Sequence, residues 1–177
     1  MPISPRLWLA RVLSVALLAA CWATSAHALG PKADVFLGYS RLGSDTFYKG
    51  AGGLNGWEGA LNVKVKRFVG IEGDVSQYGT GASASVPHST VVLFGPRVTA
   101  GAAKVHIFVH ALAGAEHSTN NSGLSATAMA VDFGGGGDVP IAPFFALRVS
   151  ADYLTAPTQS PGTGAHARYT AGVVFRF

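Results

Sequence analysis

The sequence predicts an all-β protein: an eight-stranded antiparallel up-and-down transmembrane β-barrel, preceded by a cleaved signal peptide. Three observations support this. Eight segments alternate apolar with polar or small residues, the connections between them alternate in length, and both chain ends carry export or membrane features. A strand points successive side chains to opposite faces, so each segment has one apolar and one mixed face.

Residues 1–28 are predicted to be a signal peptide, which leaves residues 29–177 as the barrel domain. Arg6 and Arg11 form a basic start, Val12–Ala20 is an apolar run, and Ala26 with Ala28 forms an A-x-A cleavage pattern. The apolar run is too short to span a bilayer as a helix, but it has the length typical of a signal peptide.

A competing interpretation of this end concerns Cys21, the only cysteine of the chain. Leu18–Cys21 resembles a lipoprotein signal, in which Cys21 would be lipidated and become the first residue. The fold would be unchanged, because Cys21 precedes the first strand. If Cys21 leaves with the signal, the exported protein has no disulfide and no cysteine-based metal site.

The first four alternating segments are Ala33–Leu42, Gly56–Lys66, Phe68–Tyr78 and Thr90–Ala100. In the first, Val35, Leu37 and Tyr39 are expected to face outward, and Phe36, Gly38 and Ser40 inward. The second and third are the clearest and are joined by a turn near Lys66. In the fourth, Pro96 removes a ladder hydrogen bond, so a bulge or a place near the barrel rim is expected there.

The last four segments are Val105–Ala115, Ala126–Asp138, Phe144–Leu154 and Arg168–Phe177. The sixth of the eight is the weakest, because it contains Gly134–Gly137. The eighth alternates apolar with mostly polar or small residues and ends on an aromatic residue; its apolar series is Tyr169, Ala171, Val173, Phe175 and Phe177.

The connections alternate between short and long, as in barrels with short periplasmic turns and longer outer loops. The short ones lie near Lys66-Arg67, Gly101–Lys104 and Pro140–Pro143, and the longer ones are Gly43–Asn55, Gly79–Ser89, Glu116–Ser125 and Thr155–Ala167. Both ends of the domain are then on the periplasmic side. In hydrocarbon no water satisfies a strand edge, so the first and last strands are expected to pair.

Charged side chains of the predicted strands fall on the non-apolar face. They are Glu58, Lys64, Glu72, Asp74, Arg97, Asp132, Arg148, Asp152 and Arg176, predicted to form a charge network in the barrel interior. Facing lipid, each basic residue near the midplane would cost about 2–4 kcal/mol. A soluble barrel of lipocalin type would alternate as well, with its apolar face inward. The signal peptide, the terminal Phe177 and the unequal connections favour the membrane barrel.

Composition excludes other classes. The formal net charge of +4 includes Arg6 and Arg11, and the remaining basic residues are scattered, so nucleic-acid binding has no support. No apolar run of about 18 residues exists, which excludes a transmembrane helix.

In their order and spacing along the chain, the segments resemble those of the small OmpA-like outer-membrane β-barrel proteins. The matching pieces are Asp34–Ser40, Asn55–Glu58, Phe94–Arg97, Phe108–Gly114, Leu147–Tyr153 and Ala171–Phe177. The resemblance implies an integral outer-membrane protein of a Gram-negative envelope, embedded in outer-membrane lipid and expected to be a monomer without a cofactor. Periplasmic chaperones and the outer-membrane insertion machinery would read an assembly signal of Tyr169, Val173, Phe175 and Phe177.

The function expected from this resemblance is a structural envelope role, with outer loops that contact surfaces or host molecules. A narrow porin-like channel is the alternative, and a lipid A-modifying enzyme is a more distant one. The enzyme hypothesis rests on Glu116-His117-Ser118 in a predicted outer loop. Adjacent His and Ser would face opposite sides of a strand, so no enzyme is expected.

Two further patterns suggest chemistry and are given a structural interpretation. His106 and His110 are four residues apart, which separates them by about 13 Å on a strand, too far to share one zinc ion. They are expected to be satisfied interior histidines. Gly134–Gly137 lacks the Lys-Ser/Thr of a phosphate loop and is expected to allow close backbone approach or a kink.

Overall fold

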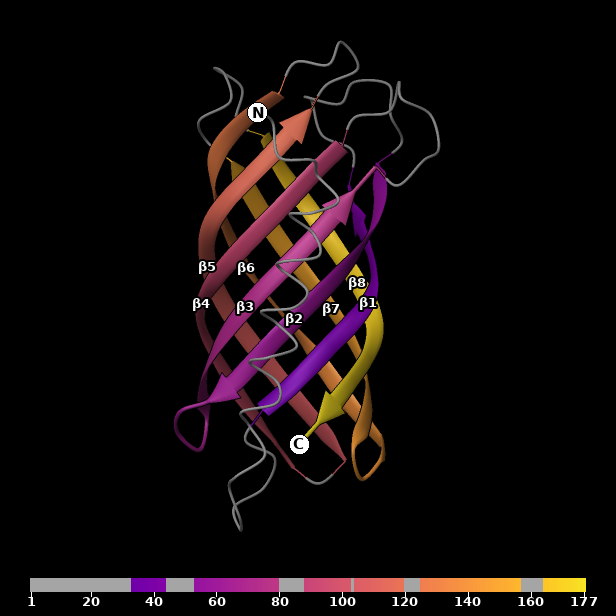
Figure 1. Cartoon of the computed structure of the whole chain (residues 1–177). Coiled ribbons are helices and arrows are strands. Elements are labelled where there is room, and N and C mark those ends of the chain that lie inside the picture. The colour runs from indigo at the N-terminus through magenta and orange to yellow at the C-terminus, as the bar shows by residue number, and fades with distance from the viewer. Residues whose placement is uncertain (1–32, 44–52, 80–87, 103, 120–124, 157–163) are drawn as a thin grey trace, which may run out of the picture. The chain divides into compact units, whose positions relative to one another are not determined.

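The computed structural model describes residues 33–43, 53–79, 88–102, 104–119, 125–156 and 164–177, and every regular element there is a β-strand. The strands are β1 Ala33–Leu42, β2 Leu54–Lys64, β3 Val69–Tyr78, β4 His88–Ala102, β5 Val105–Thr119, β6 Ser125–Ala142, β7 Phe145–Ala156 and β8 Gly164–Arg176. Each pairs antiparallel with its neighbours, and β8 returns to β1 (Figure 1). The predicted closed eight-stranded barrel is confirmed.

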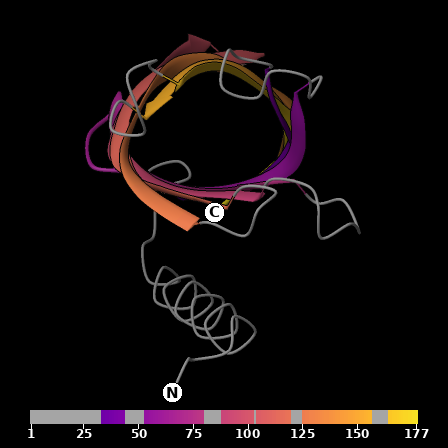
Figure 2. The ribbon, with the colours of Figure 1, turned by 90° about the horizontal axis from the view of Figure 1, so that it is seen from above.

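The closure between β1 and β8 is continuous. Its register runs from Asp34 opposite Arg176 to Leu42 opposite Arg168. Beyond the strand end, Ala33 and Phe177 exchange two backbone hydrogen bonds of 3.1 Å. Seen end-on, the strands form a ring with no free sheet edge (Figure 2), which is the arrangement that satisfies every ladder in lipid.

The predicted signal peptide, with Ala26, Ala28 and Cys21, lies outside the described residues. So do residues 44–52, 80–87, 120–124 and 157–163 of the long connections. In the described part of the chain, no helix is long and apolar enough to cross a membrane.

The two ends of the barrel differ in their connections. We call the end with the three short connections, which follow Lys64, Ala102 and Ala142, the turn end, and the opposite one the loop end. Phe177 also lies at the turn end, as its pairing with Ala33 requires (Figure 1).

Several strands extend further toward the loop end than predicted. Glu116, His117 and Ser118 were expected in an outer loop, but they belong to β5 and pair with both β4 and β6. That prediction was wrong because these polar residues continue the alternation: Glu116 is buried and His117 exposed. Polarity alone therefore does not distinguish a loop from a strand at these positions.

The two prolines also differ from expectation. Pro140 was predicted in a turn, but it lies in β6, where the register shifts between Pro140 and Ala142. Pro96 causes no register shift, because β4 pairs with β5 in the same register on both sides of it. Only Gly95 and Pro96 themselves have no pairing partner on β5. The absent N–H of Pro96 therefore falls on the β5 side, while pairing with β3 continues.

The outward face is apolar through the middle of every strand. Leu37, Phe94, Ile107 and Val149 are each more than 60% exposed. Among outward strand positions in the described residues, only Arg41, near the loop end of β1, carries a full charge. An apolar band of this kind matches a hydrocarbon surrounding.

The interior is layered along the barrel axis. At the loop end, nine buried side chains form an apolar layer: Leu42, Leu54, Tyr78, Val91, Leu93, Leu112, Ala128, Ala130 and Leu154. Toward the turn end lies a smaller group of Phe36, Ala60, Ala146 and Val174. Charged side chains fill the space between the loop-end layer and the turn end.

Candidate functional site

The inward positions of all eight strands supply two groups of buried charges. The Arg97–Arg148 cluster, nearer the turn end, consists of Asp34, Glu72, Arg97, Asp138, Arg148 and Arg176. The Arg168 cluster, nearer the loop end, consists of Glu58, Asp74, His110, Asp132, Asp152 and Arg168. We take these clusters as the candidate functional site, because buried charges are costly unless paired.

Asp138 is the centre of the Arg97–Arg148 cluster. Arg148 donates from Nε to Asp138 Oδ1 at 2.7 Å and from Nη2 to Oδ2 at 3.0 Å, which is a bidentate pair. Arg176 donates to the same Oδ2 at 3.0 Å. The result is a carboxylate from β6 held by guanidinium groups from β7 and β8.

Asp34 of β1 and Glu72 of β3 complete this cluster. Arg97 Nη1 donates to Glu72 Oε2 at 3.0 Å, and Arg148 Nη2 donates to Asp34 Oδ1 at 3.2 Å. Asn62 donates to the other oxygen of Asp34 at 3.0 Å. Three carboxylates therefore face three guanidinium groups, so the cluster is electrically balanced.

Phe108 gives the two central arginines an aromatic surface. The Arg97 guanidinium carbon lies 3.7 Å from the centre of the Phe108 ring, and that of Arg148 lies 4.7 Å from it. Arg148 is also 5.1 Å from the Phe36 ring. Cation–π attraction is strongest where water is excluded, as it is here.

Arg168 is the centre of the second cluster and is completely buried. Its Nη2 donates to Asp132 Oδ2 at 2.6 Å and its Nη1 to Asp74 Oδ1 at 3.2 Å. Glu58 Oε2 lies 3.5 Å from Nη1, and Asp152 Oδ2 lies 3.3 Å from Nε. One guanidinium from β8 thus contacts carboxylates from β2, β3, β6 and β7.

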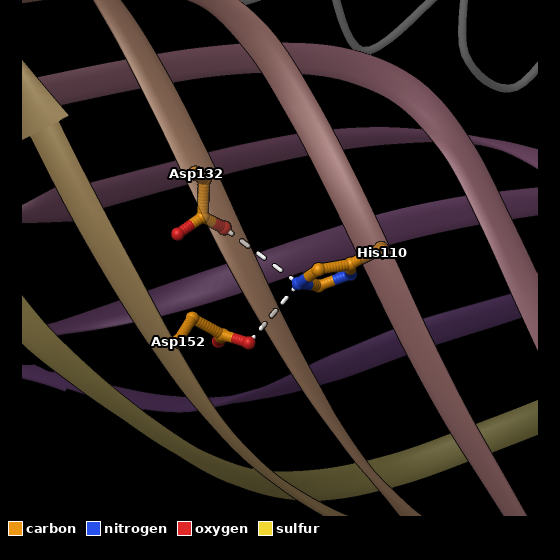
Figure 3. A group of neighbouring side chains, drawn as sticks. All are labelled: His110, Asp132 and Asp152. Atoms are coloured by element: carbon orange, nitrogen blue, oxygen red, sulfur yellow. Dashed lines mark hydrogen bonds and ion pairs between the residues drawn. The ribbon is translucent and has the colours of Figure 1, made fainter.

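His110 stands between the two clusters. Its Nε2 lies 3.0 Å from Asp152 Oδ1 and 3.7 Å from Asp132 Oδ2 (Figure 3). Its Nδ1 lies 3.4 Å from Glu72 Oε1, which belongs to the other cluster. The imidazole therefore has a carboxylate on each side, with two on the side of Nε2.

The Arg168 cluster is not balanced. Its four carboxylates face one guanidinium, an excess of three negative charges when His110 is neutral and of two when it is protonated. Asp132 is fully buried, and its Oδ1 has no hydrogen-bond partner among the described residues. With all four carboxylates ionised, such an excess in a low-dielectric interior is relieved by uptake of protons or of another cation.

Seven of the nine predicted network residues belong to these clusters as closely contacting, buried groups: Glu58, Glu72, Asp74, Arg97, Asp132, Arg148 and Asp152. Arg176 contacts Asp138 and is half-buried. Lys64 lies half-buried at the turn end of β2 and belongs to neither cluster.

Sequence reasoning missed four members of the clusters as network residues: Asp34, His110, Asp138 and Arg168. The alternation contained the necessary signal. Arg168 has the same parity in its strand as Arg176, Asp138 the same as Asp132, and Asp34 the same as Phe36. A consistent count by twos would have included all of them.

The remaining candidates are placed apart from this site. Glu116 accepts a hydrogen bond of 2.6 Å from Ser89 inside the barrel, whereas His117 faces outward and contacts Thr127 Oγ1 at 2.9 Å. The two cannot act on one substrate from opposite sides of the sheet. His106, at the turn end, is half-buried and outside both clusters.

The predicted assembly residues lie on the last strand as expected from the alternation. Tyr169, Val173 and Phe175 are exposed on the outward face. The Phe177 ring is half-buried, and its centre lies 5.6 Å from that of Phe175. Phe175 in turn contacts Phe145 of β7 edge to face at 5.3 Å.

Comparison with solved structures identifies the fold. Ail, the attachment invasion locus protein of Yersinia pestis, superposes with a TM-score of 0.58 at 19% identity, covering 84% of this chain and 100% of Ail. Neisserial surface protein A gives 0.65 at 12% identity, covering 85% and 100%. The N-terminal β-barrel domain of Pseudomonas aeruginosa OprF gives 0.62 at 14% identity, covering 84% and 100%.

The chain therefore has the fold of the small eight-stranded outer-membrane β-barrels, as its resemblance to OmpA-like proteins implied. No protein-family model and no curated protein sequence matches it. Because the sequence identities are below 20%, these comparisons show a shared fold and not a shared function.

Proposed function

We propose that the chain is an integral protein of the bacterial outer membrane with a structural envelope role, a closed barrel that carries its long connections on the cell surface. The apolar outward band supports the membrane position, since Arg41 is the one charged residue among its described positions and lies near the loop end. The fold shared with other outer-membrane barrels supports the same position.

The filled interior is the observation that carries the structural role. Arg97, Arg168, Glu72 and Asp132 are all at most 2% exposed, and the loop-end apolar layer covers them. An eight-stranded barrel has room for little more than its own side chains. A continuous aqueous path would require both the apolar layer and the ion pairs to move, which argues against a constitutive channel.

Export and assembly are part of this proposal. The turn end would face the periplasm, with Phe177 and the outward residues of β8 accessible to chaperones and the insertion machinery while the chain is still unfolded. The closing pair of Ala33 and Phe177 supports a late action of the last strand, because this pair forms only when the barrel closes.

The long connections would meet the cell exterior. One structure of Ail is of its complex with the heparin analogue sucrose octasulfate. In this chain, residues 43–53, 79–87, 120–124 and 157–163 contain one Lys and one Asp in total and are rich in Gly, Ser and Thr. A single lysine gives no support to binding of a sulfated polysaccharide, so the proposed contacts are of a neutral, hydrogen-bonding kind.

Two measurements test the proposal. Outer-membrane fractions run on a gel with and without boiling should show a band whose mobility changes on heating, as a closed detergent-resistant barrel requires. The purified barrel in a planar lipid bilayer should give no channels, with a general porin as the positive control. Discrete conductance steps would replace the structural role by the narrow channel, and a soluble protein without a heat shift would refute the membrane position.

A further inference from the structure

The Arg168 cluster contains a group that meets the geometric needs of a metal ion. His110 Nε2, one oxygen of Asp132 and one of Asp152 all lie within 4.8 Å of one another (Figure 3). The ligand atoms of a bound zinc ion, each about 2.0–2.2 Å from the metal, are separated by comparable distances. The three residues come from β5, β6 and β7, which pair with one another in sequence.

We propose that His110, Asp132 and Asp152 bind a divalent transition-metal cation inside the barrel. The donor set indicates the class of metal. Imidazole nitrogen with carboxylate oxygen suits zinc and related first-row ions, whereas Ca²⁺ and Mg²⁺ prefer oxygen ligands alone.

Charge is the first argument for an occupant. With a neutral His110, which a metal ligand must be, the Arg168 cluster has three uncompensated negative charges. A divalent ion reduces that excess to one. The neighbouring Arg97–Arg148 cluster is already balanced by its own guanidinium groups and offers no such need.

The buried, unpartnered oxygen of Asp132 is the second argument. Arg168 occupies Oδ2 of this carboxylate at 2.6 Å, and Oδ1 has no hydrogen-bond partner among the described residues. The Asp132 oxygen that faces His110 Nε2, at 3.7 Å, is Oδ2. A fully buried carboxylate oxygen without a partner is costly, and a cation that binds both oxygens of this carboxylate would also satisfy Oδ1.

The groups around the three ligands hold them in place. Glu72 Oε1 lies 3.4 Å from His110 Nδ1, so it can accept the proton of that nitrogen and leave Nε2 free for a metal. Asp152 Oδ2 accepts a hydrogen bond of 3.2 Å from Ser150, while its Oδ1 faces His110. Gly134 supplies space, because a Cβ there would overlap Asp152 Oδ1.

Access determines how the test must be done. The loop-end apolar layer lies on one side of the site, and the Arg97–Arg148 cluster with Phe108 on the other. The full chain, made without a histidine tag, should therefore be refolded from urea into detergent with Zn²⁺ present. After removal of loose metal with a chelator, the folded fraction is identified by its heat-shifted gel band, and zinc is measured by mass spectrometry.

The matched variants are His110→Gln and Asp132→Asn, with His106→Gln as the control. His106 lies on the inward face of the same strand but outside the group. The expected result is one zinc ion per folded chain in the wild type and the control, and a loss of most of it in the other two. X-ray absorption of the wild type should show a nitrogen and oxygen shell with an imidazole contribution.

Three results would overturn the proposal: a folded wild type without zinc, zinc content unchanged in both site variants, or an absorption spectrum without imidazole. Because the wild-type metal content and its spectrum decide the matter alone, the test remains valid if the variants fail to fold. A metal-free wild type would leave the proposed envelope function untouched, since that rests on membrane position and conductance.

Discussion

Arg168 of β8 and Asp132 of β6 are two completely buried, oppositely charged residues joined by a hydrogen bond of 2.6 Å across the barrel interior. β7 lies between their strands in the sheet. The same guanidinium also contacts Asp74 of β3 and Glu58 of β2, beyond β1 on the other side of β8. Its position ties together strands that share no backbone ladder.

Removing Arg168 should strongly destabilise the barrel. In Arg168→Ala, four carboxylates would remain buried without their common partner, and breaking a buried pair in this way typically costs about 3–5 kcal/mol. The measurement is the midpoint of urea unfolding, followed by loss of the heat-shiftable band. Lys64→Ala is the control, because Lys64 is half-buried outside the clusters. Equal small losses in the two variants would show that the cluster does not stabilise the fold.

Gly134→Ala and Gly137→Ala should have very different effects although both residues belong to the same run of four glycines in β6. A Cβ at Gly134 would overlap the carboxylate of Asp152 and lie 2.7 Å from its Cα. At Gly137, its nearest neighbour would be His106 O at 3.9 Å, an ordinary contact. We expect about 1–3 kcal/mol of destabilisation for the first. The measurement is urea unfolding of the two variants side by side. Similar unfolding midpoints would contradict the predicted overlap at Gly134.

Phe108→Leu tests the aromatic surface under Arg97. The leucine remains apolar but loses the ring, and a buried cation–π contact is worth about 2 kcal/mol. Phe94→Leu is the matched change on the outward face, where the ring is 62% exposed. We expect a clear fall in the unfolding free energy for the interior variant only. A fall in the unfolding free energy of Phe94→Leu alone would contradict the placement of Phe108 inside the barrel and of Phe94 outside it.

Phe177→Ala should lower the yield of assembled barrel more than the stability of the finished one. The backbone hydrogen bonds to Ala33 do not need the ring, so closure itself is retained. Phe144→Ala is the control, since this exposed aromatic also lies at the turn end. The test compares the heat-shiftable fraction in cells with the urea midpoint of purified protein. Equal yields in the two variants would argue against an assembly signal at Phe177.

The alternation predicted the barrel because strand geometry requires it. Ala33–Leu42 was predicted with its observed bounds, and the other strands differ from prediction only at their ends. The predicted ends of the strands were wrong where residues typical of turns lie within a strand. Glu116 is polar but buried against Ser89, and Pro140 sits at a register shift that tolerates it. Neither circumstance is visible without the neighbouring strands.

The candidate site was predicted only as a set of inward charges. Parity indicates that a residue faces the interior, but not its height along the axis or its partner across the lumen. Asp74 and Arg168 are 94 residues apart in the chain, and their contact depends on the stagger of all the intervening strands. The division into a balanced and an unbalanced cluster therefore emerges only from the closed sheet.

The pairing of Ala33 with Phe177 has a consequence for the order of events during synthesis. β1 pairs with β8, which follows the other seven strands in the sequence, so the barrel can close only after β8 has been made. A product lacking β8 would expose two raw sheet edges, on β1 and β7, and would leave Glu58, Asp74, Asp132 and Asp152 without their shared arginine. A chain that stops before β8 should therefore be degraded by proteases, because it cannot close into a smaller barrel.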